Sequence, residues 1–352
     1  MKLERLEKFI QLAVSFIVIL GAVACTQDDN VVYIDDDEQL AKRPFFYFFC
    51  KENAIGDLAY MDDFYAGVAN TADLKNAMLS LVTIPEDTSK LCNTFANLYR
   101  YYPRDSMRRA LLVIANDNYE DYLEKYTTKP ESDSTAVLLA ESKRTLQSAY
   151  TLNIPSYGAY YQAGIVVGKG MKEVERVLIV LANPHNSELR DMQLGFEAGL
   201  KESGRKVQCD SIYLTEDNGG YDMADSTYKM SSEINTVYQM VLPLCGGSAQ
   251  GFLRYTREHP LSLQVIGVDT DMQRYSSSVP FSVVKLTEHA IQQWISGWMQ
   301  GDEMPRHTKY GLDSGHISLI FANDDAVSDS LRHISESCLQ EAIAKEEAYE
   351  GK

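Results

Sequence analysis

Positive charge and cysteine are both scarce in this sequence of 352 residues. Lys and Arg number 33 against 50 Asp and Glu, which gives a formal net charge of −17. A surface this acidic repels nucleic-acid phosphates and anionic lipid head groups, so we expect no nucleic-acid partner. The six cysteines contain no CxxC pair and are too few for a disulfide scaffold, which excludes that class and a cysteine zinc site.

Signatures of catalysis and of metal binding are also lacking. The six histidines form no HxH or HxxxH pair. Residues 246–251 (GGSAQG) miss the GxSxG nucleophile motif by one residue, and residues 168–170 (GKG) lack the context of a phosphate-binding loop. We therefore expect no metal, no cofactor and no enzymatic activity. An α/β hydrolase-type enzyme that uses the carboxylate of Asp57 or Asp269 is a remaining alternative.

The only long apolar run lies at the N-terminus. Residues 9–24 are apolar apart from Gln11 and Ser15, and they follow the basic residues Lys2, Arg5 and Lys8. This pattern predicts a signal peptide over residues 1–24. A membrane span needs about 20 apolar residues, so a plain membrane anchor is the less favoured alternative.

The run ends in Ala22-Val23-Ala24-Cys25, which resembles a bacterial lipobox. The resemblance implies that Cys25 carries acyl chains and becomes the N-terminus of a lipoprotein in the cell envelope, outside the cytoplasm. Residues 25–42 are acidic and poor in apolar side chains, which predicts a solvated tether. An acidic tract at this place resembles surface-export signals of some lipoproteins, and the membrane face stays open.

Short apolar runs alternate with helical patterns along the rest of the chain. Most of these runs show no polar alternation, which indicates strands covered on both faces in parallel sheets and hence a doubly wound α/β fold. Helical spacing occurs over residues 189–200 and 327–338, and a further helix is predicted over 135–148. The predicted strands are residues 45–49, 79–84, 111–115, 177–182, 210–214, 237–242, 265–268 and 317–321.

Polar residues follow several of these strands, where ligands bind in open α/β sheets. Carboxylates, amides, glycine N–H groups and aromatic rings at these places suit a neutral polyhydroxylated ligand with a flat ring. The alternative is that they are turn and helix-cap residues. The stretches are residues 52–62, 116–117, 183–185, 245–252 and 269–271.

Several sequence motifs in the second half of the protein are informative because of their order. Residues 246–252, 266–271 (IGVDTD), 282–285 (SVVK) and 310–317 follow one another as in the basic membrane protein family, which the sequence resembles. Residues 157–164 and 195–199 also look like segments of that family. Its members are substrate-binding lipoproteins of ABC importers that bind purine nucleosides. The likeness covers most of residues 44–322.

The resemblance implies two doubly wound lobes of the type I periplasmic binding protein class, joined by a multi-strand hinge. Lobe I is expected to comprise residues 43–150 and about 282–309. Lobe II is expected to comprise residues 151–281 and about 310–352, with residues 151–154 as an extended crossover. An ABC permease is the implied partner, and we expect a monomer.

The resemblance also implies roles for two residues of the second half. Asp269 matches the carboxylate directed at the ribose hydroxyls, and Lys285 matches a lysine that reaches the ligand near the hinge. A buried salt bridge of Lys285 with Asp269 or Asp57 is the alternative role.

The first-lobe motif of the family corresponds to residues 57–61 here. Tyr60 keeps the aromatic ring that would stack on a base. Met61 replaces an Asn that could read the base edge, so the identity of the base stays open. Phe252 is predicted to cover the other face of the base, or alternatively to be a core residue. The remaining predicted ligand residues are Asp57, Asp62, Asn116, Asn183 and Gly247.

The sequence therefore predicts a membrane-tethered receptor that closes on a nucleoside-like molecule for uptake or sensing. The alternative is a surface-exposed sensory or interaction lipoprotein that keeps the fold without this ligand. If Cys25 is lipidated, five cysteines remain, an odd number that cannot pair completely within one chain. Four of them, Cys50, Cys209, Cys245 and Cys338, lie in apolar contexts and are expected to be free core residues.

Overall fold

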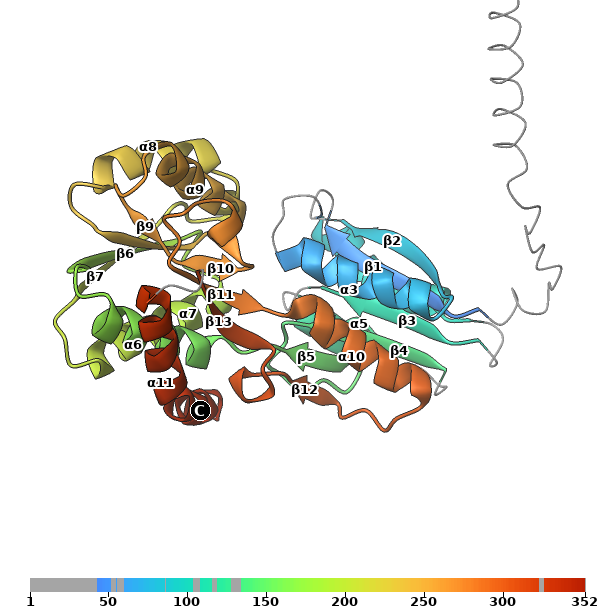
Figure 1. The fold of residues 1–352 in the computed structure, drawn as a ribbon. Helices are drawn as coiled ribbons and strands as arrows, with labels where there is room; N and C mark the ends of the chain where they lie inside the picture. The colour runs from blue at the N-terminus through green and yellow to red at the C-terminus, as the bar shows by residue number, and fades with distance from the viewer. Residues whose placement is uncertain are drawn as a thin grey trace, which may run out of the picture. The chain divides into compact units, whose positions relative to one another are not determined.

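A computed structural model describes residues 43–51, 55, 60–85, 87–103, 108–115, 119–127, 134–322 and 326–351 (Figure 1). Residues 44–352 belong to one compact unit. The predicted signal peptide, the lipidated Cys25 and the acidic tether lie outside the described residues, as do Asp57 and Asn116. Within the described part of the chain, no helix combines the length and the apolarity needed to cross a bilayer.

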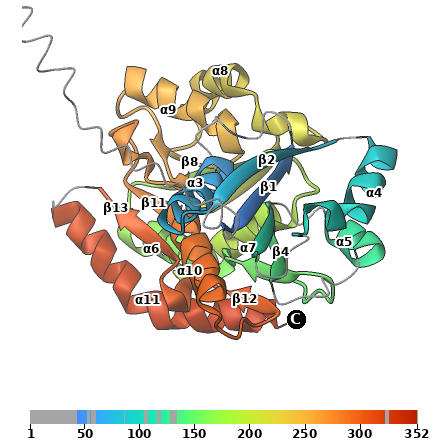
Figure 2. The same ribbon diagram turned by 90° about the vertical axis from the view of Figure 1, so that its right-hand side faces the viewer.

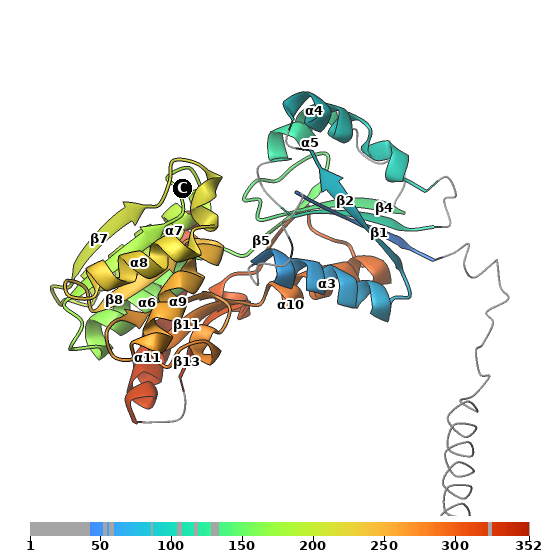
Figure 3. The same cartoon turned by 90° about the horizontal axis from the view of Figure 1, so that it is seen from above.

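A six-stranded, fully parallel sheet forms one half of this unit, in the order β12-β5-β4-β3-β1-β2. All residues of β3 and β4 are buried, which explains their continuous apolar sequence. Figure 3 shows α3 and α10 on one face of the sheet and α4 and α5 on the other. The elements are β1 (Phe45–Lys51), α3 (Tyr60–Leu74), β2 (Met78–Ile84), α4 (Thr88–Ala96), β3 (Ala110–Ile114), α5 (Glu120–Tyr126), β4 (Thr135–Ala140), β5 (Tyr150–Asn153), α10 (Thr287–Gln300) and β12 (His307–Lys309).

The predicted helix over residues 135–148 is wrong. Residues 135–140 form β4 in the middle of the sheet, and the chain turns at Glu141, which has a φ of +59°. Ala and Leu in this run favour a helix by intrinsic propensity. Burial on both faces between β3 and β5 decides the structure instead, because strand preference depends on packing with neighbours.

The other half contains a four-stranded parallel sheet, ordered β7-β6-β8-β9, and a three-stranded sheet, ordered β10-β11-β13, in which β13 is antiparallel to β11. The helices predicted near residues 189–200 and 327–338 are confirmed as α7 and α11. The elements are α6 (Tyr157–Gly170), β6 (Arg176–Leu181), α7 (Ser187–Glu202), β7 (Gln208–Tyr213), α8 (Ala224–Ile234), β8 (Met240–Leu244), α9 (Ala249–Glu258), β9 (Gln264–Val265), β10 (Gly267–Asp269), β11 (Phe281–Lys285), β13 (Ile317–Phe321) and α11 (Ala326–Glu350).

Helices α6 and α7 touch through their backbones. A Cβ atom built on Gly199 would lie 1.9 Å from the carbonyl oxygen of Tyr161, and one on Gly164 would lie 2.3 Å from that of Phe196. Only glycine leaves room for such an approach. The glycines of segments 157–164 and 195–199 are therefore explained by helix packing.

The chain passes between the six-stranded sheet and the other two sheets three times. It leaves after β5, returns between β11 and α10, and leaves again after β12. The backbone N–H of Tyr310 donates to the carbonyl oxygen of Asn153 at 2.9 Å, which ties two of these passages together. Several parallel connections of this kind agree with a multi-strand hinge, while the exact lobe boundaries stay a prediction.

The five described cysteines are all free. Cys50, Cys245 and Cys338 are buried, as expected for small core residues. Cys209 on β7 and Cys92 on α4 are partly exposed. Burial raises the pKa of the Cys209 thiol to about 12, so this side chain stays a thiol at neutral pH.

The long C-terminal helix α11 runs alongside α6 (Figure 2). Near its end, Glu346 is only 2% exposed, and its carboxylate accepts hydrogen bonds from the backbone N–H groups of Gly158 at 3.2 Å and Leu312 at 3.0 Å. Burial raises the pKa of Glu346 to about 7, although these hydrogen bonds and Lys309 lower it. A single carboxylate thus joins α11, the start of α6 and the last passage of the hinge.

Glu346 is expected to make the protein less stable as the pH rises. Its folded-state pKa is above the ordinary value of 4.5, so its contribution is present below pH 4.5 and is lost as the pH rises through about 7. The loss amounts to up to about 3 kcal/mol. Urea unfolding at pH 5 and pH 8 measures it, with Glu346→Gln as the comparison. Equal pH dependence in both proteins would contradict the assignment.

Candidate ligand-binding site

The two motifs IGVDTD and SVVK become neighbouring strands. β10 and β11 pair in parallel, with Gly267 opposite Ser282 and Asp269 opposite Val284. A Cβ on Gly267 would lie 2.0 Å from the hydroxyl oxygen of Ser282, so the glycine is required for this approach. The pairing brings Asp269 and Lys285 to the same edge of the three-stranded sheet.

A pocket of about 350 Å³ lies at this edge. Its volume falls within the range of small-molecule sites. Its walls come from α3, the ends of β10 and β11, the segment that follows β10, and the start of α10. The residues that line it are Asp63, Asp269, Thr270, Asp271, Arg274, Val284, Lys285, Leu286, Thr287, Glu288, His289 and Gln292.

Asp269 is held in a left-handed backbone conformation, with a φ of +62°. This conformation costs most residues with a Cβ atom about 1–2 kcal/mol, and Asp and Asn adopt it more readily than other such residues. Such strain is typical of functional positions that the surrounding structure fixes. Burial raises the pKa of Asp269, the charges of Glu188 and Asp63 act in the same direction, and Lys285 opposes them.

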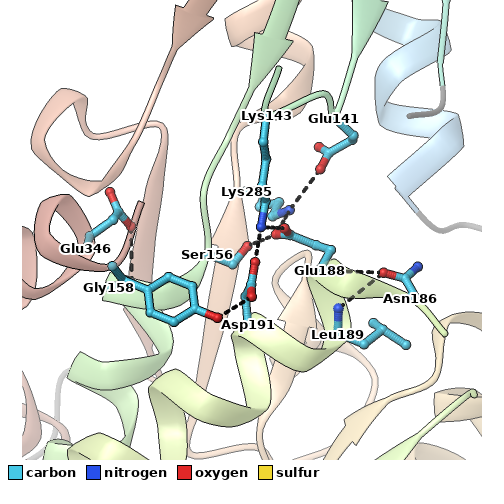
Figure 4. A network of polar contacts seen from close by, with 11 residues as sticks. Glu141, Lys143, Ser156, Gly158, Asn186, Glu188, Leu189, Asp191, Lys285 and Glu346 are labelled. Atoms are coloured by element: carbon cyan, nitrogen blue, oxygen red, sulfur yellow. Dashed lines mark hydrogen bonds and ion pairs between the residues drawn. The ribbon is translucent and has the colours of Figure 1, made fainter. Parts of the chain in front are cut away.

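Lys285 is buried, with an exposed fraction of 5%. Its Nζ donates to Oε1 of Glu188 at 2.9 Å and lies 3.6 Å from Oε2 of Glu141 (Figure 4). Burial would lower the pKa of Lys285, but the charges of Glu141, Glu188 and Asp269 outweigh it and raise the pKa. Lys285 therefore forms buried salt bridges with Glu141 and Glu188, and Asp269 adds its charge. The other predicted partner, Asp57, lies outside the described residues.

Glu188 lies in the first turn of α7, and its carboxylate also accepts a hydrogen bond from the Ser156 hydroxyl. Burial would raise the pKa of Glu188, yet Lys285 and Lys143 lower it below its ordinary value. The network continues through an ion pair between Lys143 and Asp191. In Figure 4 these side chains point toward one another from β11, α7 and the segment after β4.

Helix α3 begins at Tyr60, within the first-lobe motif. Asp63 lines the pocket, whereas the predicted Asp62 precedes it on the helix. Burial raises the pKa of Asp63, and the charges of Glu288 and Asp62 raise it further. Met61 packs partly buried against the hydrophobic core. Because the side chain of Tyr60 lies outside the description, its stacking role stays a prediction.

Three predicted residues serve the local structure. Phe252 is completely buried in the hydrophobic core, as its predicted alternative role of a core residue requires. Asn183 is 2% exposed and accepts from the backbone N–H groups of His185 and Asn186 at 3.0 and 3.2 Å, as a turn residue does. A Cβ on Gly247 would lie 3.1 Å from the carbonyl oxygen of Tyr221.

Tyr221 is an aromatic residue of this region that sequence reasoning did not select. Its hydroxyl accepts from the side-chain amide of Asn186 at 2.8 Å, and its ring lies against Gly246, which has a φ of +53°. Burial raises the pKa of Tyr221, and the charge of Asp269 adds to the effect. The glycine-rich stretch 246–251 therefore packs on this tyrosine.

Comparisons with known proteins show which family and which solved structures this protein resembles. A family model described as ABC transporter substrate-binding protein PnrA-like (Bmp) matches residues 106–349. No curated protein matches the sequence. The chain is similar in structure to an ABC transporter solute-binding protein of Aeropyrum pernix K1, with a TM-score of 0.63, 14% identity and coverage of 88% of this chain and 90% of that one.

Two further solved structures show the same fold. One is a transcriptional activator of the comK gene from Bacillus halodurans, with a TM-score of 0.64, 14% identity and coverage of 84% and 96%. The other is a periplasmic solute-binding protein of Actinobacillus succinogenes 130z with bound D-allose, with a TM-score of 0.58, 11% identity and coverage of 83% and 100%. The chain therefore has the type I periplasmic binding protein fold and belongs to the Bmp family of PnrA-like ABC transporter substrate-binding proteins.

Proposed function

We propose that this protein is a lipid-anchored, extracytoplasmic receptor that takes a neutral, nucleoside-like molecule into the pocket beside β10 and β11. It delivers the ligand to an ABC permease or signals its presence. The observation that carries the proposal is the strained Asp269, placed next to Lys285 in a pocket of small-molecule size. Anchoring through Cys25 rests on the lipobox-like sequence alone.

The chemistry of the pocket favours a ligand that donates hydrogen bonds. Its walls carry the carboxylates of Asp63, Asp269, Asp271 and Glu288. A carboxylate accepts from two neighbouring hydroxyl groups at once, and each such bond contributes about 1.5–3 kcal/mol when water is excluded. Vicinal hydroxyls, as in a ribose, fit Asp269 well.

Calorimetric titration with adenosine, guanosine and inosine tests the proposal. We expect the wild-type protein to bind at least one of them, and Asp269→Asn to bind it at least tenfold more weakly, because Asn accepts from one oxygen only and carries no charge. The variant should keep its fold, since Asn tolerates the left-handed conformation. Asp225→Asn is the matched control, because that carboxylate is almost fully exposed.

Two results would contradict the proposal. A folded wild-type protein that binds none of the nucleosides would favour the alternative of a sensory or interaction protein without this ligand. Equal affinity of the wild type and Asp269→Asn would remove Asp269 from the site.

A further inference from the structure

Glu141 joins two parts of the fold that are far apart in the sequence. It follows β4 of the six-stranded sheet, and its carboxylate lies 3.6 Å from the Nζ of Lys285 on β11 of the three-stranded sheet. Its φ of +59° is one that glycine adopts freely and glutamate does not. The chain nevertheless places a long acidic side chain here, and that side chain is directed at the lysine in the pocket (Figure 4).

The charges around Lys285 are unbalanced. Lys143 is paired with Asp191 and lies 3.8 Å from Glu188, while Lys285 is held by Glu188 and Glu141. Asp269 adds a further carboxylate. Among the described residues, four carboxylates thus lie around two ammonium groups, so both positive charges are neutralised before any ligand arrives.

From this arrangement we propose that Glu141 is a specificity-determining residue. Its carboxylate pairs with the ammonium group of Lys285 and thereby makes the pocket reject anionic ligands. A lysine in a ligand pocket is otherwise a binding site for phosphate or carboxylate groups. Glu188 holds Lys285 from its own half of the fold, and Glu141 adds the second negative charge from the opposite sheet. An incoming anion must therefore displace Glu141 or approach an excess of negative charge.

Inorganic phosphate is the probe that tests this without any assumption about the natural ligand. We expect Glu141→Gln and Glu141→Gly, each in the full chain, to bind phosphate at least tenfold more tightly than the wild type in calorimetric titration. The double variant Glu141→Gln/Lys285→Met should lose this gain. Glu303→Gln removes an exposed carboxylate and should behave as the wild type. Phosphate affinities equal to that of the wild type in both Glu141 variants would overturn the proposal.

A second measurement rests on the proposed function and separates the two hypotheses. The ratio of the affinities for guanosine 5′-phosphate and guanosine should rise at least tenfold in Glu141→Gln. If guanosine binds but the ratio is unchanged, the inference fails and the proposed function stands. If no protein binds guanosine while the Glu141 variants gain phosphate binding, the proposed function fails and the inference stands. Glu141→Gly relieves the backbone strain and carries the test if Glu141→Gln does not fold.

Discussion

Replacing Lys285 with Met is expected to lower the free energy of unfolding by about 3–5 kcal/mol. The substitution removes the positive charge that the carboxylates of Glu188 and Glu141 both face, and leaves these two negative charges close together in a buried network. Removing one partner of a buried ion pair is more costly than the pair itself is stabilising, because the remaining charge stays buried. Urea unfolding at neutral pH measures the loss, and a titration on the folded fraction should show that ligand binding is also lost.

Two further variants serve as controls for the predicted effect of Lys285→Met. Lys201→Met removes an exposed lysine at the end of α7 and should change stability by less than about 0.5 kcal/mol. The double variant Lys285→Met/Glu188→Gln should recover part of the loss, because one of the two neighbouring carboxylates is then replaced by a neutral group. A loss below about 1 kcal/mol in Lys285→Met would mean that solvent replaces the network at little cost.

Replacing Gly199 with Val should prevent α6 and α7 from packing. The Cβ atom would lie 1.9 Å from the carbonyl oxygen of Tyr161, and a helix backbone cannot move aside as a flexible side chain can. Ordinary overpacking costs about 1–3 kcal/mol, and we expect this substitution to exceed that range because it separates two helices. Thermal unfolding and the yield of soluble protein measure the effect.

The control for Gly199 separates packing from backbone conformation. Gly204 has a φ of +76° but no atom within 4 Å of the position of a Cβ. Gly204→Ala should therefore cost only about 1 kcal/mol, from the left-handed conformation. The smaller substitution Gly199→Ala should cost clearly more. Equal losses in the two alanine variants would show that the close approach of α6 and α7 does not limit stability.

The fold class could be predicted because the signal is local. Continuous apolar runs between helical patterns indicate buried parallel strands, and the structure confirms this for β1, β3 and β6. The prediction failed at residues 135–148, where Ala and Leu are compatible with either state and only the neighbouring strands decide. β12 was missed because a three-residue strand with the sequence HTK carries no apolar pattern.

The residues of the candidate site were also predicted only in part. Asp269 and Lys285 were found because they end two motifs that follow one another along the chain. Glu141, Glu188 and Tyr221 were missed because their roles depend on contacts between segments that are distant in the sequence. A weak signal existed for Glu188, since it lies in the first turn of a helix that follows a buried strand. The role of Phe252 stayed open in the sequence because position at a helix start does not distinguish a core ring from an exposed one.

The order in which the chain visits its sheets has a consequence for biosynthesis. The six-stranded sheet receives its covering helix α10 and its edge strand β12 only after residues 154–286 have been made. Trp294 of α10 is fully buried, with its ring 5.5 Å from that of Tyr150, so the sheet lacks part of its core until then. Contacts between such distant segments slow folding. The core of the six-stranded sheet therefore cannot be completed until α10 has been synthesised, even though β1 to β5 are among the first elements made.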